Sequence, residues 1–192
     1  NACFDRANLA YAALMQAKLA GASFLEANLS KSNFADADAS NCDLSNATIM
    51  QTRFERTNLR GSKFEGSILT EVNLEAAQCQ RLKLSHTTVL RSQLSGADFS
   101  NADLSKTSFI ECSMKHVRFC TALLVSADFV TCMLNGSNFD NSQAKNIRFV
   151  HGSSLQATSF RKAQMYGASL RAMPLQQSNF SAALLDGSDF SK

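Results

Sequence analysis

Large hydrophobic residues recur at every fifth position along nearly the whole chain. Starting at Phe4, one follows every five residues as far as Phe149, and after one extra residue the same spacing runs from Leu155 to Phe190. Of these 38 central positions, 35 hold Phe, Leu, Ile, Val or Met, and all 14 Phe of the chain fall among them. A short repeat that continues without interruption indicates a solenoid built from five-residue units.

A second position, two residues before each centre, holds a small side chain. In 33 of the 38 units it is Ala, Ser, Thr or Cys. Alternate residues of an extended segment point to the same side, so the large and the small residue are expected to face inward together. Five residues turn an α-helix by about 500°, which would spread the large residues over all sides. The pattern therefore predicts short strands joined by corners, with the other three positions facing water.

The Phe residues also recur at spacings of 20, as in Phe109, Phe129 and Phe149. This spacing stacks the rings if each coil of the solenoid contains four units. Parallel ladder hydrogen bonds place successive coils about 4.8 Å apart. The 38 units therefore predict an all-β, parallel β-helix of about 9.5 coils of 20 residues, in one domain over residues 1–192.

Several units carry the same three-residue motif. Residues 7–9 read Ala-Asn-Leu, and residues 97–99 and 127–129 read Ala-Asp-Phe. These motifs resemble the A-(D/N)-L-x-x signature of the pentapeptide-repeat family, and the resemblance covers essentially the whole chain. It implies a right-handed, four-sided β-helix. The family includes domains of larger proteins, among them bacterial secreted effectors, and quinolone-resistance proteins that resemble DNA in shape and charge and bind DNA gyrase.

The repeat is irregular at one internal place and continues to both ends of the sequence. Between Phe149 and Leu155 the spacing is six, which predicts a one-residue bulge at a corner, with Gly152 in a backbone geometry that other residues avoid. Neither end shows an amphipathic helix or a polar cap. We therefore expect a fragment of a longer chain, or ends covered by an adjoining domain or by end-to-end contact with another copy.

Composition and charge narrow the cellular setting. The net charge is +3 with both signs interspersed, and no apolar run is long enough to span a bilayer. The six Cys form no C-x-x-C pair, which favours free thiols in a reducing compartment. Without a visible cleavable signal, we expect a cytoplasmic protein, or an effector delivered into a host cell. We expect a protein partner, and neither a membrane nor a nucleic acid.

Candidate catalytic groups are dispersed over the solenoid. Each His lies two positions after a centre, at corners on three different sides, where the three cannot act together. Three of the Cys replace the small inward residue, where a thiol acts as a small hydrophobe. We therefore expect no enzyme activity, no metal and no cofactor. The residues concerned are His86, His116, His151, Cys42, Cys112 and Cys132.

One outward column is unusually apolar. Read at spacings of 20 along one side, the residue just after the centre is large and apolar at five places, with three further apolar residues nearby. Exposed apolar rows of this kind mark partner surfaces. The alternative is that β-branched residues occur here only because they favour strands. The five residues, here called the apolar stripe, are Met50, Leu90, Ile110, Val130 and Val150, and the three nearby are Leu123, Val125 and Met133.

These observations favour a non-catalytic rod that binds a protein partner or serves as a scaffold. The alternative is a DNA-mimicking protein that binds DNA gyrase, as the resemblance to the quinolone-resistance proteins allows. Duplex DNA carries one negative charge about every 1.7 Å, so a mimic should be strongly acidic. The net charge of +3 disfavours this alternative.

Overall fold

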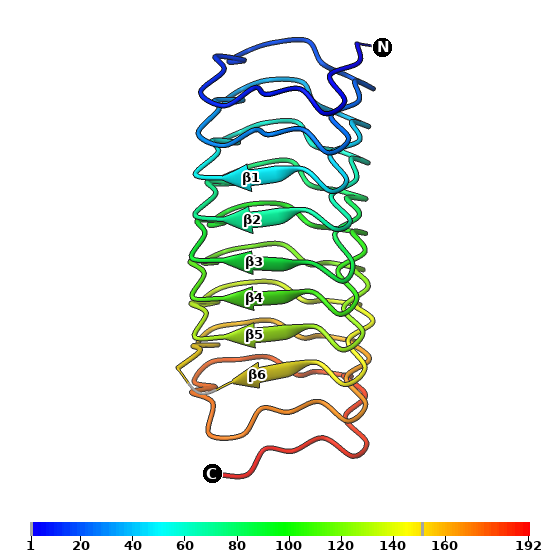
Figure 1. The fold of residues 1–192 in the computed structure, drawn as a ribbon. Helices are drawn as coiled ribbons and strands as arrows, with labels where there is room; N and C mark the ends of the chain where they lie inside the picture. Colours follow the sequence, from blue (N-terminus) through cyan, green and yellow to red (C-terminus); the bar gives the residue numbers. More distant parts are fainter. Residues whose placement is uncertain (1, 151) are drawn as a thin grey trace.

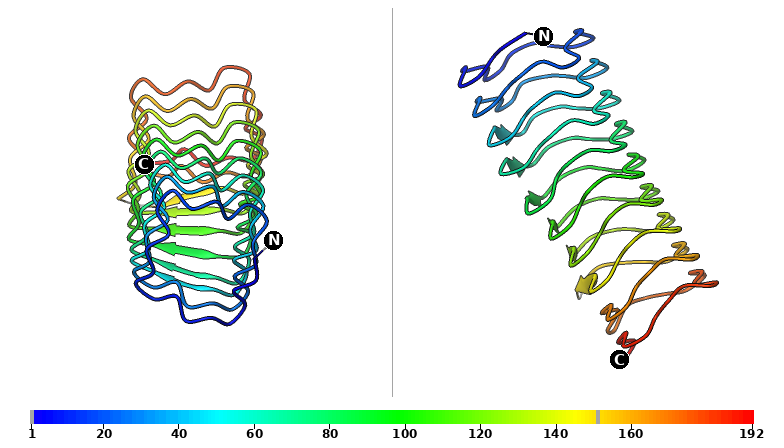
Figure 2. Two further views of the ribbon diagram at one scale, coloured as in Figure 1. Left: turned by 90° about the horizontal axis from the view of Figure 1, so that it is seen from above. Right: turned by 90° about the vertical axis from the view of Figure 1, so that its right-hand side faces the viewer.

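The computed structural model describes residues 2–150 and 152–192, which form a single rod of stacked coils (Figure 1). Four ladders of parallel bridges begin at Cys3, Asn8, Ala13 and Lys18, and each joins a residue to the one 20 positions later. Four ladders per coil give the rod four sides, which are visible in the view along it (Figure 2). The expected parallel β-helix is confirmed. The described residues contain no helix of the length and hydrophobicity needed to cross a membrane.

Among the described residues, regular strands form on one side of the rod only. They pair in parallel, each with the next along the chain, in one six-stranded sheet. These strands cover about five turns rather than the expected 9.5 coils, and isolated bridges continue the ladders toward both ends. The strands are Thr48–Met50 (β1), Ile68–Thr70 (β2), Thr88–Leu90 (β3), Ser108–Ile110 (β4), Asp128–Val130 (β5) and Arg148–Val150 (β6).

The central residues fill the interior, as their period predicts. Phe129 stacks between Phe109 and Phe149, at ring-centre distances of 5.1 and 5.3 Å. It also meets the rings of Phe119 and Phe139 edge-on, each at 5.9 Å. Because stacked and edge-to-face pairs both add to the energy of burial, the aromatic rows tie each coil to its neighbours.

The small inward position is often a hydroxyl residue, and the structure explains why. Thr52 Oγ1 donates a hydrogen bond to the carbonyl of Leu29 at 2.8 Å, and Thr57 Oγ1 donates to the carbonyl of Phe34 at 2.7 Å. The acceptor is the central residue 23 positions earlier, in the preceding coil. A buried hydroxyl is therefore hydrogen-bonded, and it joins two coils without occupying the space of a large side chain.

The corners place the residue two positions after each centre in the left-handed region. In the described chain 29 residues other than Gly adopt positive φ there, including Ala76 at 53°. All eight Gly of the sequence also have positive φ. Only Gly enters this region without cost, so each non-Gly corner is held by the ladder bonds on either side of it. The sequence pattern did not predict this requirement.

The expected irregularity lies where the spacing placed it. Up to this point bridges join residues 20 apart, but Met133 pairs with Ser154, 21 positions later. Gly152 has a φ of +93°, and a Cβ there would lie 3.2 Å from Thr131 Oγ1. The one-residue bulge, with a geometry suited to Gly, is confirmed.

Candidate functional site

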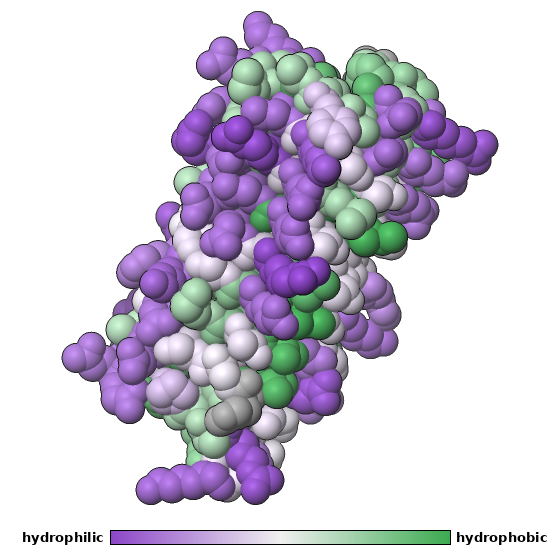
Figure 3. Space-filling model, turned by 60° about the vertical axis from the view of Figure 1, so that its left-hand side comes forward, coloured by the Kyte–Doolittle hydropathy of each residue, from purple (hydrophilic) through white to green (hydrophobic). Residues whose placement is uncertain are grey.

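The sheet aligns the apolar stripe in a single row. Each stripe residue is the last residue of its strand, and parallel pairing in register places these residues directly above one another. Space-filling Figure 3 shows a strip of hydrophobic surface along this part of the rod. Thr70 of β2 is the one interruption. In order along the rod the row is Met50, Thr70, Leu90, Ile110, Val130 and Val150.

The stripe is only partly open to solvent. Met50 and Val150 are 43% and 39% exposed, whereas the three apolar residues between them are half-buried. Residues one coil apart lie close enough to cover each other's flanks. A partner would therefore meet a narrow apolar ridge rather than separate protruding side chains.

The three apolar residues expected near the stripe lie on the adjoining sides of the rod. Met133, 45% exposed, lies just past the corner that follows β5. Leu123 pairs with Asp103 in a ladder on the preceding side, and Val125 follows two residues later on that side. Met133 thus lies one corner past the stripe end of β5, whereas Leu123 and Val125 lie one corner before the opposite end of that strand.

The sequence reading missed one strongly exposed apolar residue on the stripe side. Ile68, the first residue of β2, is 57% exposed and faces outward, as does Thr70 at the other end of that strand. With Thr70 and Leu90 it lines a shallow hollow of about 310 Å³. The signal was available, because the residue before each centre faces outward as well as the residue after it.

A row of corner residues beside the stripe carries charges of both signs. Arg91 Nη2 lies 3.5 Å from Glu71 Oε1, and Gln51 Nε2 donates to Glu71 Oε2 at 2.8 Å. Within the described chain Glu111 forms no ion pair. The stripe therefore has a polar rim, which is the usual arrangement at protein interfaces.

The titratable candidates among the described residues are not brought together in the structure. His86 lies beside the hollow at Ile68, while His116 lies against Gly136 on another side of the rod. His151 is outside the described residues. No three His, Cys, Asp or Glu side chains of the described residues converge as metal ligands do.

The inward thiols are buried, as their positions predict. Cys42, Cys112 and Cys132 are each at most 1% exposed. Burial raises the pKa of the Cys42 thiol to about 11. Because the thiolate is the nucleophile, Cys42 is poorly suited to nucleophilic chemistry at neutral pH.

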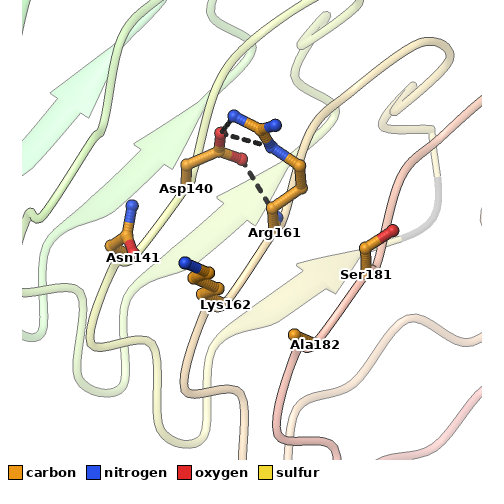
Figure 4. Close-up of a pocket in the computed structure, with 6 residues that line it drawn as sticks. All are labelled: Asp140, Asn141, Arg161, Lys162, Ser181 and Ala182. Atoms are coloured by element: carbon orange, nitrogen blue, oxygen red, sulfur yellow. Dashed lines mark hydrogen bonds and ion pairs between the residues drawn. The ribbon is translucent and has the colours of Figure 1, made fainter.

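A charged pair lies on the side of the rod opposite the stripe (Figure 4). The guanidinium of Arg161 donates to Asp140 Oδ2 from Nε at 2.9 Å and from Nη2 at 2.8 Å. The Arg161 N–H and the Ser159 hydroxyl both donate to Asp140 Oδ1. Burial disfavours the charged carboxylate, but these hydrogen bonds outweigh it and lower the pKa of Asp140. The pair joins two coils and lines a hollow of about 330 Å³.

The chain is similar to proteins of solved structure. The solved structure of QnrB1, a plasmid-mediated fluoroquinolone resistance protein, superimposes with a TM-score of 0.56 at 15% identity, covering 93% of this chain and 86% of that one. HetL from the cyanobacterium Nostoc, a pentapeptide repeat protein involved in heterocyst differentiation regulation, is 22% identical over 98% of this chain and 86% of its own, with a TM-score of 0.40.

The structural likeness and the family profile support different conclusions. At these identities the likeness to QnrB1 supports the fold alone. No curated protein sequence matches the chain. The family profile described as "pentapeptide repeat region" matches residues 7–88 and 90–155, well over half of the sequence. Together with the four-sided stack of five-residue units, this match shows that the chain belongs to the pentapeptide-repeat family.

Proposed function

We propose that this chain is a rigid, non-catalytic rod that binds another protein along the apolar stripe. The observation that carries the proposal is the in-register row of apolar side chains on the outer face of β1 to β6. Contiguous exposed apolar surface marks interaction sites more often than scattered apolar residues do. A rod of this kind would also serve as one domain of a larger bacterial protein, such as a secreted effector.

The dimensions of the stripe favour an elongated partner segment. Six strands span five steps of about 4.8 Å, or about 24 Å, and the row is one residue wide. Such a strip offers less area than the roughly 800 Å² per partner of a standard interface. A strand or helix of another protein, lying along the rod, would use the full length of the stripe.

The hollow beside Ile68 supplies an anchoring point for that segment. It lies where Thr70 interrupts the large residues of the stripe, and Leu90 forms its border. Hot spots of binding energy occur where a large side chain fills a pocket and the contacts around that pocket exclude water. We propose that one apolar side chain of the partner occupies this hollow.

The decisive experiment compares two double variants that place charges on strands of the same sheet. Ile110→Asp with Val130→Asp places two carboxylates in the stripe. Thr48→Asp with Ser108→Asp places the same charges in the outward column at the other end of the strands, at residues that do not line the hollow beside Ile68. The immobilised wild-type chain would first be used to identify a partner, whose affinity for each variant is then measured by calorimetry.

We expect the stripe variant to lose at least about tenfold in affinity, since burying a carboxylate against apolar surface costs more than 1.4 kcal/mol. The control should bind within about threefold of wild type, a difference of less than 1 kcal/mol. Circular dichroism would verify that both variants fold. If the stripe variant keeps both its partner and its oligomeric state, the apolar row reflects strand propensity alone.

DNA mimicry is the competing proposal, and the same assay addresses it. Each of the four sides of this rod carries both signs of charge, and none forms the continuous acidic row that a mimic of duplex DNA needs. We therefore expect no binding to DNA gyrase. Saturable binding of gyrase by the purified chain would favour mimicry over the stripe.

A further inference from the structure

Positive charge is concentrated on the side opposite the stripe. This side contains the centres from Leu19 to Phe180 and carries six Lys or Arg against three Asp, an excess equal to the net charge of the whole chain. The outward columns of this side are therefore the most cationic surface of the rod. The residues are Lys18, Arg60, Arg81, Arg118, Arg161 and Lys162, with Asp38, Asp98 and Asp140.

A hollow of about 450 Å³ lies on this cationic side, and no carboxylate lines it. Its lining residues are Asn41, Arg60, Gly61, Gln80, Arg81 and Asn101. Gly61 leaves the floor open because it has no side chain. A Cβ at Gly61 would lie 2.5 Å from Asn41 Oδ1, and its φ of +69° suits Gly. The glycine thus creates a recess between two arginines on successive coils.

The two guanidinium groups have no anionic partner among the residues that the structure describes. Arg60 Nε donates to Gln80 Oε1 at 3.0 Å, and Gln80 Nε2 in turn donates to Asp98 Oδ2 at 2.8 Å. The neutral amide therefore orients Arg60 without cancelling its charge. Neither Arg60 nor Arg81 forms an ion pair within the described part of the chain.

The hollow at Arg161, farther along the same side, shows the opposite arrangement. There Asp140 accepts both guanidinium hydrogen bonds and neutralises the arginine (Figure 4). The two hollows are built from equivalent outward positions, and the charge of the first is uncompensated. The Arg161 hollow keeps only one cation without an ion pair among the described residues, Lys162, and is therefore a less cationic internal control for any anion that binds at the first.

We propose that the hollow between Arg60 and Arg81 binds the phosphate group of a phosphomonoester or of free phosphate. At pH 7 a phosphomonoester carries a charge of about −1.5 to −2, which matches two guanidinium groups, whereas a carboxylate would match only one. Guanidinium groups also suit the geometry of phosphate oxygens. Asn101 Oδ1 accepts from Thr121 Oγ1 at 2.9 Å, so its amide nitrogen is available as a further donor.

The test follows backbone amide signals by NMR while inorganic phosphate is added, with chloride at matched ionic strength as the reference. We expect saturable shifts at Gly61 and Arg81 that chloride does not produce, and no comparable shift at Lys162 in the control hollow. Equal responses to phosphate and chloride, or an equal response at Lys162, would overturn the proposal.

Two variants separate the charge of the hollow from its shape. Arg81→Gln removes one guanidinium from an exposed corner, and Gly61→Asn fills the floor without changing charge, since Asn tolerates positive φ. We expect each to weaken phosphate binding about tenfold or more, equivalent to 1.4 kcal/mol. The control Arg56→Gln alters an arginine already paired with Asp36 at 2.7 Å on another side, and should bind like wild type. Unchanged affinity in both hollow variants would contradict the assignment.

The source of the phosphate is distinguished by two further probes, O-phosphoserine and serine. If O-phosphoserine binds at least as tightly as inorganic phosphate, and serine does not bind, the hollow accepts a phosphorylated side chain. If inorganic phosphate binds and O-phosphoserine does not, the ligand is free phosphate. Failure of both phosphate-bearing probes refutes the proposal, and it does so independently of whether the stripe binds a protein.

Discussion

At the scale of single residues, the rod is held together by polar atoms that reach between coils as well as by its apolar interior. Thr57 is buried, yet its hydroxyl satisfies the carbonyl of Phe34 in the coil before. Asp140 is nearly as enclosed, and its carboxylate receives hydrogen bonds from Ser159 and Arg161 in the coil after. Inter-coil contacts of this kind are sensitive to protonation only where the acceptor is a carboxylate.

The pair of Asp140 and Arg161 predicts an acid-dependent part of the stability. Because folding lowers the pKa of Asp140, the carboxylate stabilises the fold above its unfolded pKa of about 3.9, and this contribution is lost as the pH falls through the lower, folded value. Asp140→Asn should cost about 2 kcal/mol at pH 7 and progressively less below about pH 4. Urea unfolding at several pH values would measure the difference.

The matched control for this prediction is Asp186→Asn, whose side chain forms no ion pair within the described residues. It should change the free energy of unfolding by less than about 0.5 kcal/mol at every pH. A loss at Asp140 that is as large at pH 2 as at pH 7 would show that the charge of the carboxylate is not the cause.

At the scale of the five-residue element, the left-handed corner costs conformational free energy, and the hydrogen bonds between coils offset that cost. A non-Gly residue in the left-handed region costs about 1–2 kcal/mol, and 29 described residues adopt positive φ there. The chain tolerates this because the N–H of the corner residue is bonded to the next coil, as for Ala76 N to Ser95 O at 3.1 Å, and the following N–H closes the turn, as for Ala77 N to Leu74 O at 3.0 Å. The element is therefore stable only as part of a stack.

Gly96 offers a direct measurement of the corner cost. Its φ is +73°, and the nearest atom to an added Cβ is the backbone nitrogen of Ala76, 4.0 Å away, so a methyl group fits without a clash. Gly96→Ala should therefore lower the free energy of unfolding by about 1 kcal/mol through backbone strain alone. Gly96→Asn should cost less, because Asn enters this region more readily than Ala. Denaturant unfolding of both variants would check the order, and equal stability of Gly96→Ala and wild type would contradict it.

At the scale of the whole molecule, each coil uses the same inward positions, so coils are interchangeable parts. Bridges join residues 20 apart everywhere except across the bulge, where the separation is 21. Solenoids of this kind have a stability that is roughly the sum of terms for each repeat and each interface between neighbours. Their length can therefore change in whole coils, while their register cannot slip.

Removing one coil tests this modularity. Deletion of residues 85–104 joins Leu84 to Ser105 and keeps every centre in register, so the variant should fold into a rod shorter by about 4.8 Å. Deletion of residues 85–102 removes two residues fewer but misplaces every later centre, so it should unfold or aggregate. Circular dichroism and small-angle scattering would distinguish the two. A well-folded product from the second deletion would contradict the register argument.

The buried positions of this fold could be predicted from the sequence, whereas much of the arrangement of its exposed residues and corners could not. Burial imposes the five-residue period on the core, which is why stacked rings such as Phe109 and Phe129 were expected and found. The left-handed corner leaves little trace, because residues as different as Ala76 and Gly96 occupy it. The stripe could be predicted from the 20-residue spacing of its members. Ile68 was missed because the stripe was traced only through the residue after each centre, and Ile68 lies before its centre. The pairing of Asp140 with Arg161 requires the 21-residue step of the bulge, so it appears only once the bulge is included.

The nearly constant separation of paired residues, 20 or 21 positions, has a further consequence for the folding and unfolding of the rod. Every ladder closes a loop of the same modest length, so each added coil meets the same entropic cost and gains the same kind of contact. Folding can begin in any coil and spread in both directions, as in other linear arrays. In the isolated polypeptide of residues 1–192, opening should begin at its two terminal coils, which there have a neighbour on one side only. Amide protons near Phe109 should consequently exchange with solvent far more slowly than those near Phe4 or Phe180.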